Sequence, residues 1–407
     1  MARTSTRLTG RGIALLVLGG LTSVGAAYIG ERDLLWVTLT VALLPLAAFA
    51  YLLLVRPRVS HVREVTPDTV AVGESARSVL HIANEAPGQA SPLRFTDQAP
   101  SSLGGGASFL IARGFGQWRQ AVAYSVETTQ RGRYELGPLT AHATDPFALA
   151  SARFTSAGTS NQLRVTPRIW PLESLAGGAS MGSADEGTPV RVGQAGQDDV
   201  LVREHRHGDD IRRVHWRMSA KQGELMVRLE EHPWDPSSTL VVDTRSGSHF
   251  GSGPEGSLEW VVSAVSSIGA LLAEGRHRLT IVAPSGLVFD SGHSVGQPAK
   301  RAMIDAMTDL QSTEQDWLGN AVADPADLNN AASIIAATGL LTAADAAALV
   351  AAGARARSQI VLAPDSRAWG EHNDEHDDAC RLLLNHGWTV EKYRPRERMP
   401  SVWSRVS

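Results

Sequence analysis

The sequence has a single cysteine, Cys380, so no disulfide bond can form within the chain. One thiol permits a reducing compartment without requiring one. Lysine is almost as scarce, with three in 407 residues, and arginine supplies nearly all of the positive charge. The formal net charge is −4, which excludes a general electrostatic attraction of the whole chain to nucleic acid.

Two catalytic signatures are also missing from the sequence. It has no P-loop pattern, so nucleotide chemistry would have to come from a partner. It has no Gly-x-Ser-x-Gly nucleophile elbow, although "SGSH" at 246–249 brings a serine and a histidine together. Without an assignable base, orienting group and oxyanion hole, serine hydrolysis is not supported, and we expect no catalytic residues.

Two long apolar runs dominate the first sixty residues, Ile13–Ile29 and Leu34–Val55. At about 1.5 Å per helical residue, each is long enough to cross the roughly 30 Å hydrocarbon layer. A cleaved signal peptide would explain the first run but not the second. Because only "GERD" (30–33) separates them, we predict a transmembrane helical hairpin.

Charges around the hairpin predict its orientation. Arginines 3, 7 and 11 precede it and arginines 56, 58 and 63 follow it, whereas the short loop holds one arginine beside two acids. By the positive-inside rule, both termini and all of the soluble residues face the cytoplasm. We expect a plasma-membrane protein that crosses the bilayer twice.

The pattern changes after the hairpin to short alternating runs bounded by turn residues. Strands are predicted at 78–84, 121–127, 134–143 and 162–167, a spacing typical of an Ig-like β-sandwich. After residue 239 strands alternate with helices: "TLVVD" (239–243), "RLTIVAP" (278–284) and "QIVLAP" (359–364) are separated by helical patterns. This alternation indicates a mostly parallel sheet covered by helices in three layers.

The chain is therefore divided as follows: a basic tail at 1–11, two transmembrane helices at 12–55, a β-sandwich at 56–171, a linker at 172–199, a polar segment at 200–238, an α/β domain at 239–395 and a C-terminal tail at 396–407.

The polar segment contains the densest cluster of charge, "REHRHGDDIRRVHWRMSA" at 203–220. We predict an extended stretch to residue 207, a helix capped by Asp209 or Asp210, and a returning strand at 224–233 with Leu225 facing inward. Trp216 is expected to be buried. Ion pairing of Arg203, Arg206 and Arg212 with Glu204, Asp209 and Asp210 explains the mixed charges more simply than phosphate binding does, so we expect no nucleic acid.

This segment closely resembles the signature of the domain of unknown function 58 family. The matching residues are Arg203, Gly208, Asp209, Arg212, Trp216, Ser219, Ala220 and Lys221. "RGRYELGPL" (131–139) and "DPFALA" (145–150) are also similar to this family, which often has glycine where Ala148 stands.

The resemblance implies a bacterial, membrane-anchored partner of MoxR-type AAA+ ATPases with a C-terminal domain of von Willebrand factor A type. We therefore expect a non-enzymatic adaptor or assembly factor, in envelope or stress-related complex maturation, with the ATPase, the lipid bilayer and other membrane proteins as partners. The expected partner surface comprises Arg203, Gly208, Asp209, Asp210, Arg212, Arg213, Trp216, Arg217, Ser219 and Lys221, with Arg213, Arg217 and Lys221 facing outward.

The alternative is a metal-dependent binding module or enzyme centred on Asp243. Domains of von Willebrand type hold Mg²⁺ through Asp-x-Ser-x-Ser, but "DTRSGS" here places Arg245 and Gly247 at the serine positions. Ser246 and Ser248 lie one residue out of register. We expect a degenerate loop, no bound metal and no cofactor, with Arg245 opposing a cation or replacing its charge.

A zinc site is the other metal hypothesis. His372 and His376 are four residues apart, the spacing of one helical face. His386 is the remaining ligand candidate downstream, and the neighbouring acids suit a helix N-terminus, where they oppose the macrodipole. A solvated acidic helix start is therefore favoured.

Overall fold

The computed structural model describes residues 5–54, 58–85, 92–112, 116–173, 202–204, 216–228, 237–322 and 331–406. The chain divides into two compact units. The first is Met1–Trp170 with His249–Ser267 and Ala302–Ser312, and the second is Pro171–Ser248, Ile268–Arg301 and Thr313–Ser407.

The first described element is a strand, β1 (Ser5–Leu8), within the segment that was predicted to be a cytoplasmic basic tail. β1 pairs with a later strand, β10, so the residues before the hairpin belong to the β-rich body. The hairpin follows as α1 (Gly10–Ile29) and α2 (Arg32–Leu54), both long and apolar enough to span a membrane. Thr9 caps α1 by accepting a hydrogen bond from the Gly12 N–H.

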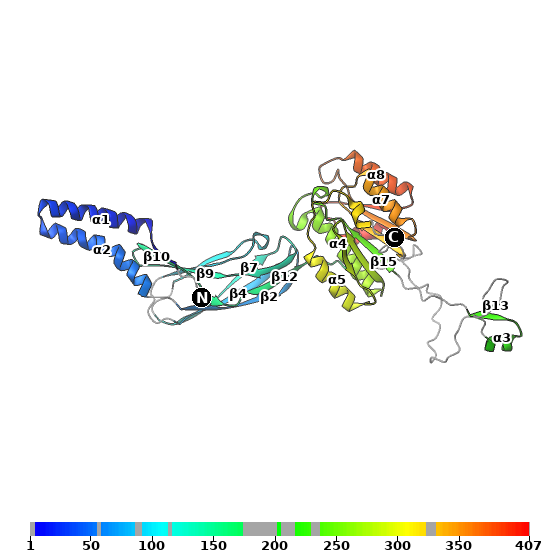
Figure 1. Cartoon of the computed structure of the whole chain (residues 1–407), viewed down its shortest axis with the longest axis horizontal. Coiled ribbons are helices and arrows are strands. Elements are labelled where there is room, and N and C mark those ends of the chain that lie inside the picture. The colour runs from blue at the N-terminus through cyan, green and yellow to red at the C-terminus, as the bar shows by residue number, and fades with distance from the viewer. Residues whose placement is uncertain are drawn as a thin grey trace. The chain divides into compact units, whose positions relative to one another are not determined.

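The described strands of the β-rich body form three sheets, and Figure 1 shows the body as the group of strands that includes β2, β4, β7, β9, β10 and β12. The five-stranded sheet has the order β1-β10-β9-β5-β6, from β10 (Ala150–Thr155), β9 (Leu139–Thr144), β5 (Leu93–Asp97) and β6 (Ala107–Ile111). The four-stranded sheet has the order β11-β2-β4-β7, from β11 (Ala157–Gly158), β2 (Val59–Thr66), β4 (Ser75–Asn84) and β7 (Trp118–Glu127). The third is β3 (Thr69–Ala71), β12 (Asn161–Thr166) and β8 (Gly132–Leu136).

One apolar core joins the five- and four-stranded sheets. Leu80 and Ile82 of β4 lie in the same buried cluster as Phe95 of β5 and Phe154 of β10, and Ala48 and Leu52 of α2 complete it. The base of the hairpin is thus part of this core. Strand alternation produces it, because every second residue of β4 is buried.

The turn between β9 and β10 fixes the start of α1. Ala148 has φ 58°, the left-handed region that favours glycine, which agrees with the glycine common in the similar family. The Ala148 carbonyl accepts a hydrogen bond from Thr9 Oγ1, and the Leu149 carbonyl accepts one from the Thr9 N–H. A Cβ on Gly12 would lie 2.1 Å from the Leu149 oxygen, so only glycine allows this close approach.

The second unit is built on a six-stranded sheet of order β17-β16-β15-β18-β19-β20. Its strands are β15 (Ser237–Val242), β16 (Arg278–Ala283), β17 (Gly286–Asp290), β18 (Ser333–Ala337), β19 (Ser358–Pro364) and β20 (Thr389–Tyr393). All neighbours pair in parallel except β16 and β17, so the predicted mostly parallel sheet is present. β17 and β18 were not predicted.

The helices of the α/β part are α4 (Ser257–Glu274), α5 (Gln297–Asp309), α7 (Ala343–Gly353), α8 (Asp374–Asn385) and α9 (Met399–Val406). α4 and α5 lie on one side of the sheet and α7 and α8 on the other (Figure 1). This follows from right-handed crossovers that run in opposite directions from β15. α4 also has the length and apolarity of a membrane span, but 83% of its apolar window is buried in protein.

α9 corrects the predicted C-terminal tail. Met399, Val402 and Trp403 are buried, and the Trp403 Nε1–H donates to the Glu173 carbonyl at 3.0 Å. The residues after 395 therefore belong to the folded unit rather than extending from it.

Short 3-10 turns, η1 (Ser101–Leu103), η3 (Ser246–Ser248), η4 (Gly253–Glu255) and η5 (Leu318–Val322), complete the described elements, together with β13 (Val202–Glu204), α3 (Trp216–Gln222) and β14 (Met226–Arg228).

Candidate functional site

The candidate site lies where β15 and β18 end side by side. Asp243 directly follows β15, and Thr338 and Gly339 directly follow β18. These neighbouring parallel strands lead to helices on opposite sides of the sheet. In open α/β sheets, ligands usually bind at the carboxyl ends of two neighbouring strands of this kind.

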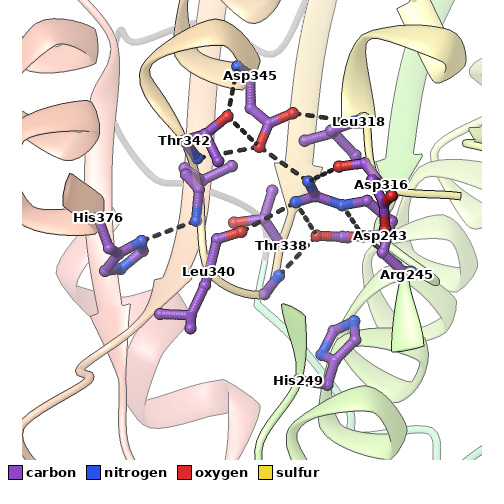
Figure 2. A network of polar contacts seen from close by, with 12 residues as sticks. Asp243, Arg245, His249, Asp316, Leu318, Thr338, Leu340, Thr342, Asp345 and His376 are labelled. Atoms are coloured by element: carbon purple, nitrogen blue, oxygen red, sulfur yellow. Dashed lines mark hydrogen bonds and ion pairs between the residues drawn. The ribbon is translucent and has the colours of Figure 1, made fainter. Parts of the chain in front are cut away.

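Arg245 fills this position with its guanidinium group (Figure 2). Nε donates to Asp243 Oδ1 at 2.9 Å and Nη2 donates to Asp243 Oδ2 at 2.8 Å, a two-pronged pair. Nη1 donates to Asp345 Oδ2 at 2.8 Å. The carbonyls of Asp316 and Leu340 accept further hydrogen bonds at 3.0 and 2.9 Å. These five contacts match the five N–H groups of a guanidinium.

Asp345 lies in the first turn of α7 and forms a capping box with Thr342, the N-cap of that helix. Its Oδ2 accepts from the Thr342 N–H, and the Thr342 hydroxyl accepts from the Asp345 N–H, which makes a capping box. Asp345 Oδ1 accepts from the Leu318 N–H at 2.9 Å. The Asp345 side chain therefore accepts from the loop at Leu318, stabilises the start of α7 and pairs with Arg245.

Gly339 closes the other side of the site. Its N–H donates to Asp243 Oδ2 at 3.0 Å. A Cβ at this position would lie 2.3 Å from the Ser248 carbonyl oxygen, so a side chain would separate the two loops. Glycine is required here for close backbone approach.

The network is buried and electrostatically matched. Side-chain exposure is 2% for Arg245 and 0% for both Asp243 and Asp345. Burial lowers the pKa of Arg245, but its hydrogen bonds and the charges of Asp243 and Asp345 more than compensate, so its pKa lies above the usual value. The guanidinium remains charged in the folded protein.

The residues present do not fit a magnesium ion. Each Asp243 oxygen already accepts two hydrogen bonds, from Arg245 or from the Gly339 N–H. Gly247 has no side chain to offer, and Ser246 is exposed outside the network. Mg²⁺ requires a near-octahedral set of oxygens at about 2.1 Å, which a guanidinium in the centre prevents. Arg245 occupies the place that a cation would take.

The two histidines of the zinc hypothesis have different surroundings. His372 is partly exposed and pairs with Asp374 at 2.9 Å. His376 is buried: its Nδ1 accepts from the Leu341 N–H and its Nε2 bonds to the Pro364 carbonyl, each at 3.0 Å. Within the described residues no group of three or more His, Cys, Asp or Glu side chains could hold a metal.

The helix start around His376 agrees only partly with the sequence prediction. Asn373 caps α8, and Asp374, Glu375 and Asp377 occupy its first turn, as expected. His376 itself is not solvated, because it joins the loop after β18 to the end of β19. Burial lowers the pKa of His376, which favours the neutral ring.

The histidine of "SGSH" contacts a serine farther along the chain. His249 Nδ1 lies 3.0 Å from Ser257 Oγ, and Ser257 Oγ accepts from the Phe250 N–H at 2.8 Å. This arrangement fixes the turn that leads into α4.

The signature segment is described only in part. β13 and β14 pair antiparallel, as the predicted extended stretch and returning strand require. Gly208, Asp209, Asp210, Arg212 and Arg213 lie outside the described residues, as does the predicted helix cap. The side chains of Arg203 and Arg217 are likewise outside what the structure describes.

Two predictions for this segment are wrong. Trp216 is 65% exposed rather than buried, and Leu225 is 48% exposed rather than facing inward. α3 has seven residues, too few to enclose an indole, and β13 and β14 form a sheet of two strands. Ser219 is half-buried, and Lys221 is exposed, as predicted.

Asp345, Asp316 and Leu340 were missed by the sequence analysis. The capping-box pattern "TAAD" at 342–345 was visible, but it indicates a helix start and not a partner for Arg245. The other two contribute main-chain oxygens, for which no side-chain signal exists.

These features define a chain with an apolar helical hairpin, a β-rich body and an α/β unit closed at its carboxyl edge by an internal ion pair. Residues 201–345 match the family described as "Protein of unknown function DUF58". The predicted resemblance is confirmed, and the chain carries a DUF58 region that includes Asp243, Arg245 and Asp345. No curated protein matches.

Three solved structures illustrate the similarity at low sequence identity. The crystal structure of the CARDB domain of PF1109 from Pyrococcus furiosus, in complex with di-metal ions, is 14% identical over 27% of this chain and 93% of that one, with a TM-score of 0.19. The solution structure of the same domain is 14% identical over 27% of this chain and 94% of that one, with a TM-score of 0.18. Pseudomonas fluorescens alkylpurine DNA glycosylase AlkC, bound to DNA, is 17% identical over 31% of this chain and 39% of that one, with a TM-score of 0.15.

Proposed function

We propose that this protein is a membrane-anchored, non-enzymatic adaptor or assembly factor that works with a MoxR-type AAA+ ATPase. In this proposal the β-rich body is an Ig-like β-sandwich and the α/β unit is of von Willebrand factor A type. Both termini and the soluble residues face the cytoplasm. The resemblance to the DUF58 family supports the partnership, and the arginines flanking the hairpin support the topology.

The observation that carries the proposal is the position of Arg245. The carboxyl edge of the sheet is where a metal or small ligand would bind, and there the chain places its own cation between two buried aspartates. The buried oxygens are used internally, so the edge has rigid loops rather than reactive groups. A rigid, closed edge suits protein binding better than catalysis.

An exposed aromatic residue marks the surface to test. Trp216 is 65% exposed on α3 and lies five residues before the exposed Lys221. Tryptophan is enriched in the residues that dominate binding energy at protein interfaces. Its location in the signature segment makes it our first candidate for contact with the ATPase.

The test is co-purification of a MoxR-type ATPase with the full-length protein from detergent-solubilised membranes, with ATP, with ADP and without nucleotide. We expect Trp216→Ala to reduce recovery about tenfold or more, as loss of an interface tryptophan does. Leu384→Ala is the control, since Leu384 is 53% exposed on α8. Absence of enrichment in every nucleotide state would contradict the proposal.

Calorimetry on the same purified protein distinguishes the metal-dependent alternative from the adaptor proposal. Because Arg245 fills the site, titration with Mg²⁺ or Mn²⁺ should give no saturable heat. Micromolar binding abolished by Asp243→Ala would favour the alternative. A reporter fused after Ser407 tests topology independently: activity restricted to the outside of the cytoplasm would contradict the predicted orientation.

A further inference from the structure

One face of the five-stranded sheet carries a row of basic side chains. Arg153 of β10 lies directly opposite His142 of β9, and His142 lies opposite Arg94 of β5. Residues directly opposite on neighbouring strands point to the same face. On β1, Ser5 pairs with Arg153. Arg7 is two residues after Ser5 in the same strand and therefore lies on the same face. We call Arg7, Arg94, His142 and Arg153 the basic face.

The basic face is exposed and has no opposing charge among the described residues. The three arginines are exposed, and none of them forms an ion pair within the part of the chain that the structure describes. The other outward positions of these strands are serine, threonine or leucine. The strand register places these charges close together, and burial together with Arg153, Arg7 and Arg94 lowers the pKa of His142.

The four-stranded sheet of the same body provides a contrast. Its outward positions mix both signs, with Glu64 and His81 3.9 Å apart and Arg77 and Glu127 both exposed. Both sheets therefore carry exposed arginines, but on the four-stranded sheet acidic side chains accompany them. The described outward positions of the five-stranded sheet, which contains the strand leading into the hairpin, have no acidic side chain.

An exposed aromatic residue lies at the end of this sheet nearest to α1. Phe147 is 67% exposed, in the turn between β9 and β10. The carbonyls of the two residues that follow it, Ala148 and Leu149, accept hydrogen bonds from Thr9. The turn is fixed, because Asp145 Oδ2 accepts from the Phe147 N–H at 2.9 Å and Oδ1 accepts from Ala150. Phe147 is thereby held beside the first turn of a membrane-length helix.

The strand register places the charges within reach of a lipid headgroup layer. Arg7 is two residues before the helix cap, and Arg153 is four residues after Leu149. At about 3.3 Å per residue, the row lies roughly 7–13 Å from the base of α1. That distance is comparable with the Debye length of about 8 Å at physiological salt.

We propose that the basic face, together with Phe147, binds the headgroup region of anionic phospholipids in the leaflet next to the base of the hairpin. The proposal rests on the membrane anchoring included in the proposed function and adds the lipid class and the residues. Arginines interact with the headgroup phosphates, while Phe147 enters the interfacial layer as aromatic residues of membrane proteins do. The β-rich body would then lie against the bilayer in one orientation.

The arrangement of the arginines favours a lipid surface over a single phosphate ion. Arg94 and Arg153 are two strands apart, about 10 Å at the usual strand spacing. Donors for one phosphate would converge on one point, whereas this row faces outward from a sheet. Nucleic acid is disfavoured because the exposed aromatic residue near the row, Phe147, lies in the turn beside the start of α1 rather than between the arginines, where a base bound to this row would stack.

Native mass spectrometry of the full-length protein in detergent micelles tests the proposal, with phosphatidylglycerol or phosphatidylcholine titrated into the micelles. We expect wild-type protein to retain phosphatidylglycerol at lower concentration than phosphatidylcholine. The triple variant Arg7→Gln/Arg94→Gln/Arg153→Gln should raise the phosphatidylglycerol midpoint about a hundredfold at low salt, at about one kcal/mol per arginine. Added salt should reduce the difference.

Two control variants separate charge from folding. Arg7→Lys/Arg94→Lys/Arg153→Lys keeps the charge and should keep the wild-type midpoint. Arg77→Gln removes an exposed arginine from the other sheet and should change nothing. Phe147→Ser should raise the midpoint for both lipids, because the aromatic contact does not depend on headgroup charge.

Several outcomes would overturn the inference. These are equal retention of the two lipids by wild-type protein, an unchanged midpoint in the glutamine variant, loss in the lysine variant, or displacement of lipid by millimolar inorganic phosphate. Carbonate extraction of membranes tests the anchoring separately. Protein released by carbonate would contradict the hairpin anchor, whereas retained protein with no lipid preference would contradict the basic face alone.

Discussion

Arg63 in the β-rich body and Arg245 in the α/β unit are both buried guanidinium groups, with side-chain exposures of 0% and 2%. Arg63 pairs with one carboxylate, Asp97, and with the Leu136 carbonyl, and its Nε has no hydrogen-bond partner. Arg245 pairs with two carboxylates and two carbonyls. The first arginine connects strands of three sheets, β2, β5 and β8, and the second joins the loops at a position suited to ligand binding.

The comparison shows that a buried guanidinium can have all of its N–H donors paired or only some of them. A buried donor without a partner costs about 1–3 kcal/mol, and Arg63 bears such a cost. Arg245 has every donor paired, and its two aspartates also accept main-chain N–H groups. A complete network gives a fixed loop geometry at the carboxyl edge, which is its role in the function proposed above.

Arg245→Ala should be the most destabilising of these substitutions. It would leave Asp243 and Asp345 buried beside each other without a cation, at a cost of about 3–5 kcal/mol. For a unit of this size the melting temperature should fall by about 10 °C. Thermal unfolding of the purified protein measures it. Arg278→Ala is the control, because Arg278 and Asp290 form a half-exposed pair worth at most about 1 kcal/mol. Equal effects of the two variants would contradict a structural role for the network.

Arg63→Ala should be the next most damaging change. Asp97 would lose its cation but keep the hydroxyl of Tyr124, which donates to Oδ2 at 2.6 Å. We expect a loss of about 3 kcal/mol in the free energy of unfolding. Limited proteolysis should show cleavage of the β-rich body before the α/β unit, the reverse of the order for Arg245→Ala. The same order in both variants would break the comparison between two independent networks.

A pH-dependent prediction concerns His376, next to the Arg245 network. Its Nδ1 accepts from the Leu341 N–H, so protonation of that nitrogen would remove the bond. The pKa of His376 is lowered in the folded protein, mainly by burial. The unfolded state therefore binds the proton more tightly, and stability is full above about pH 6.5 and is lost as the pH falls below it. His61 and His277, whose pKa values burial also lowers, add to this loss.

Melting temperatures between pH 7.5 and 5 measure this loss. His376→Gln keeps an acceptor and a donor without a titratable ring, so its melting temperature should depend less steeply on pH than that of the wild type. If the melting temperature of the variant depends on pH as steeply as that of the wild type, protonation of His376 does not contribute to the loss of stability.

The sequence predicted much of the fold and little of the site. α4, α5, α7, α8 and their neighbouring strands follow from apolar periodicity and turn residues. β18 was missed because "SIIAA" is a short apolar run that fits a strand or a helix equally well. α9 was missed because its buried face consists of three residues in an eight-residue helix. Such short elements form through tertiary packing.

The Arg245 network illustrates why sites are harder to predict. The sequence showed that Arg245 interrupts a metal motif, and it left open whether the arginine opposes a cation or replaces its charge. The second partner, Asp345, is 100 residues away and reaches the site because β15 and β18 are neighbours. Strand order is a property of the whole sheet, so no local pattern could identify this pair.

The smallest effect expected is that of Tyr124→Phe in the β-rich body. Removing the hydroxyl leaves Asp97 with Arg63 alone, at a cost of about 1 kcal/mol for one hydrogen bond. Burial and the hydrogen bond to Asp97 raise the pKa of Tyr124 to about 12. The folded state therefore holds the phenol proton more tightly than the unfolded state, so its contribution is complete below about pH 10 and is lost as the pH rises to about 12. The variant should be slightly less stable at pH 8 and lack this part of the alkaline loss. A wild-type absorbance titration with all tyrosines ionising near pH 10 would contradict the buried hydrogen bond and leave Asp97 dependent on Arg63 alone.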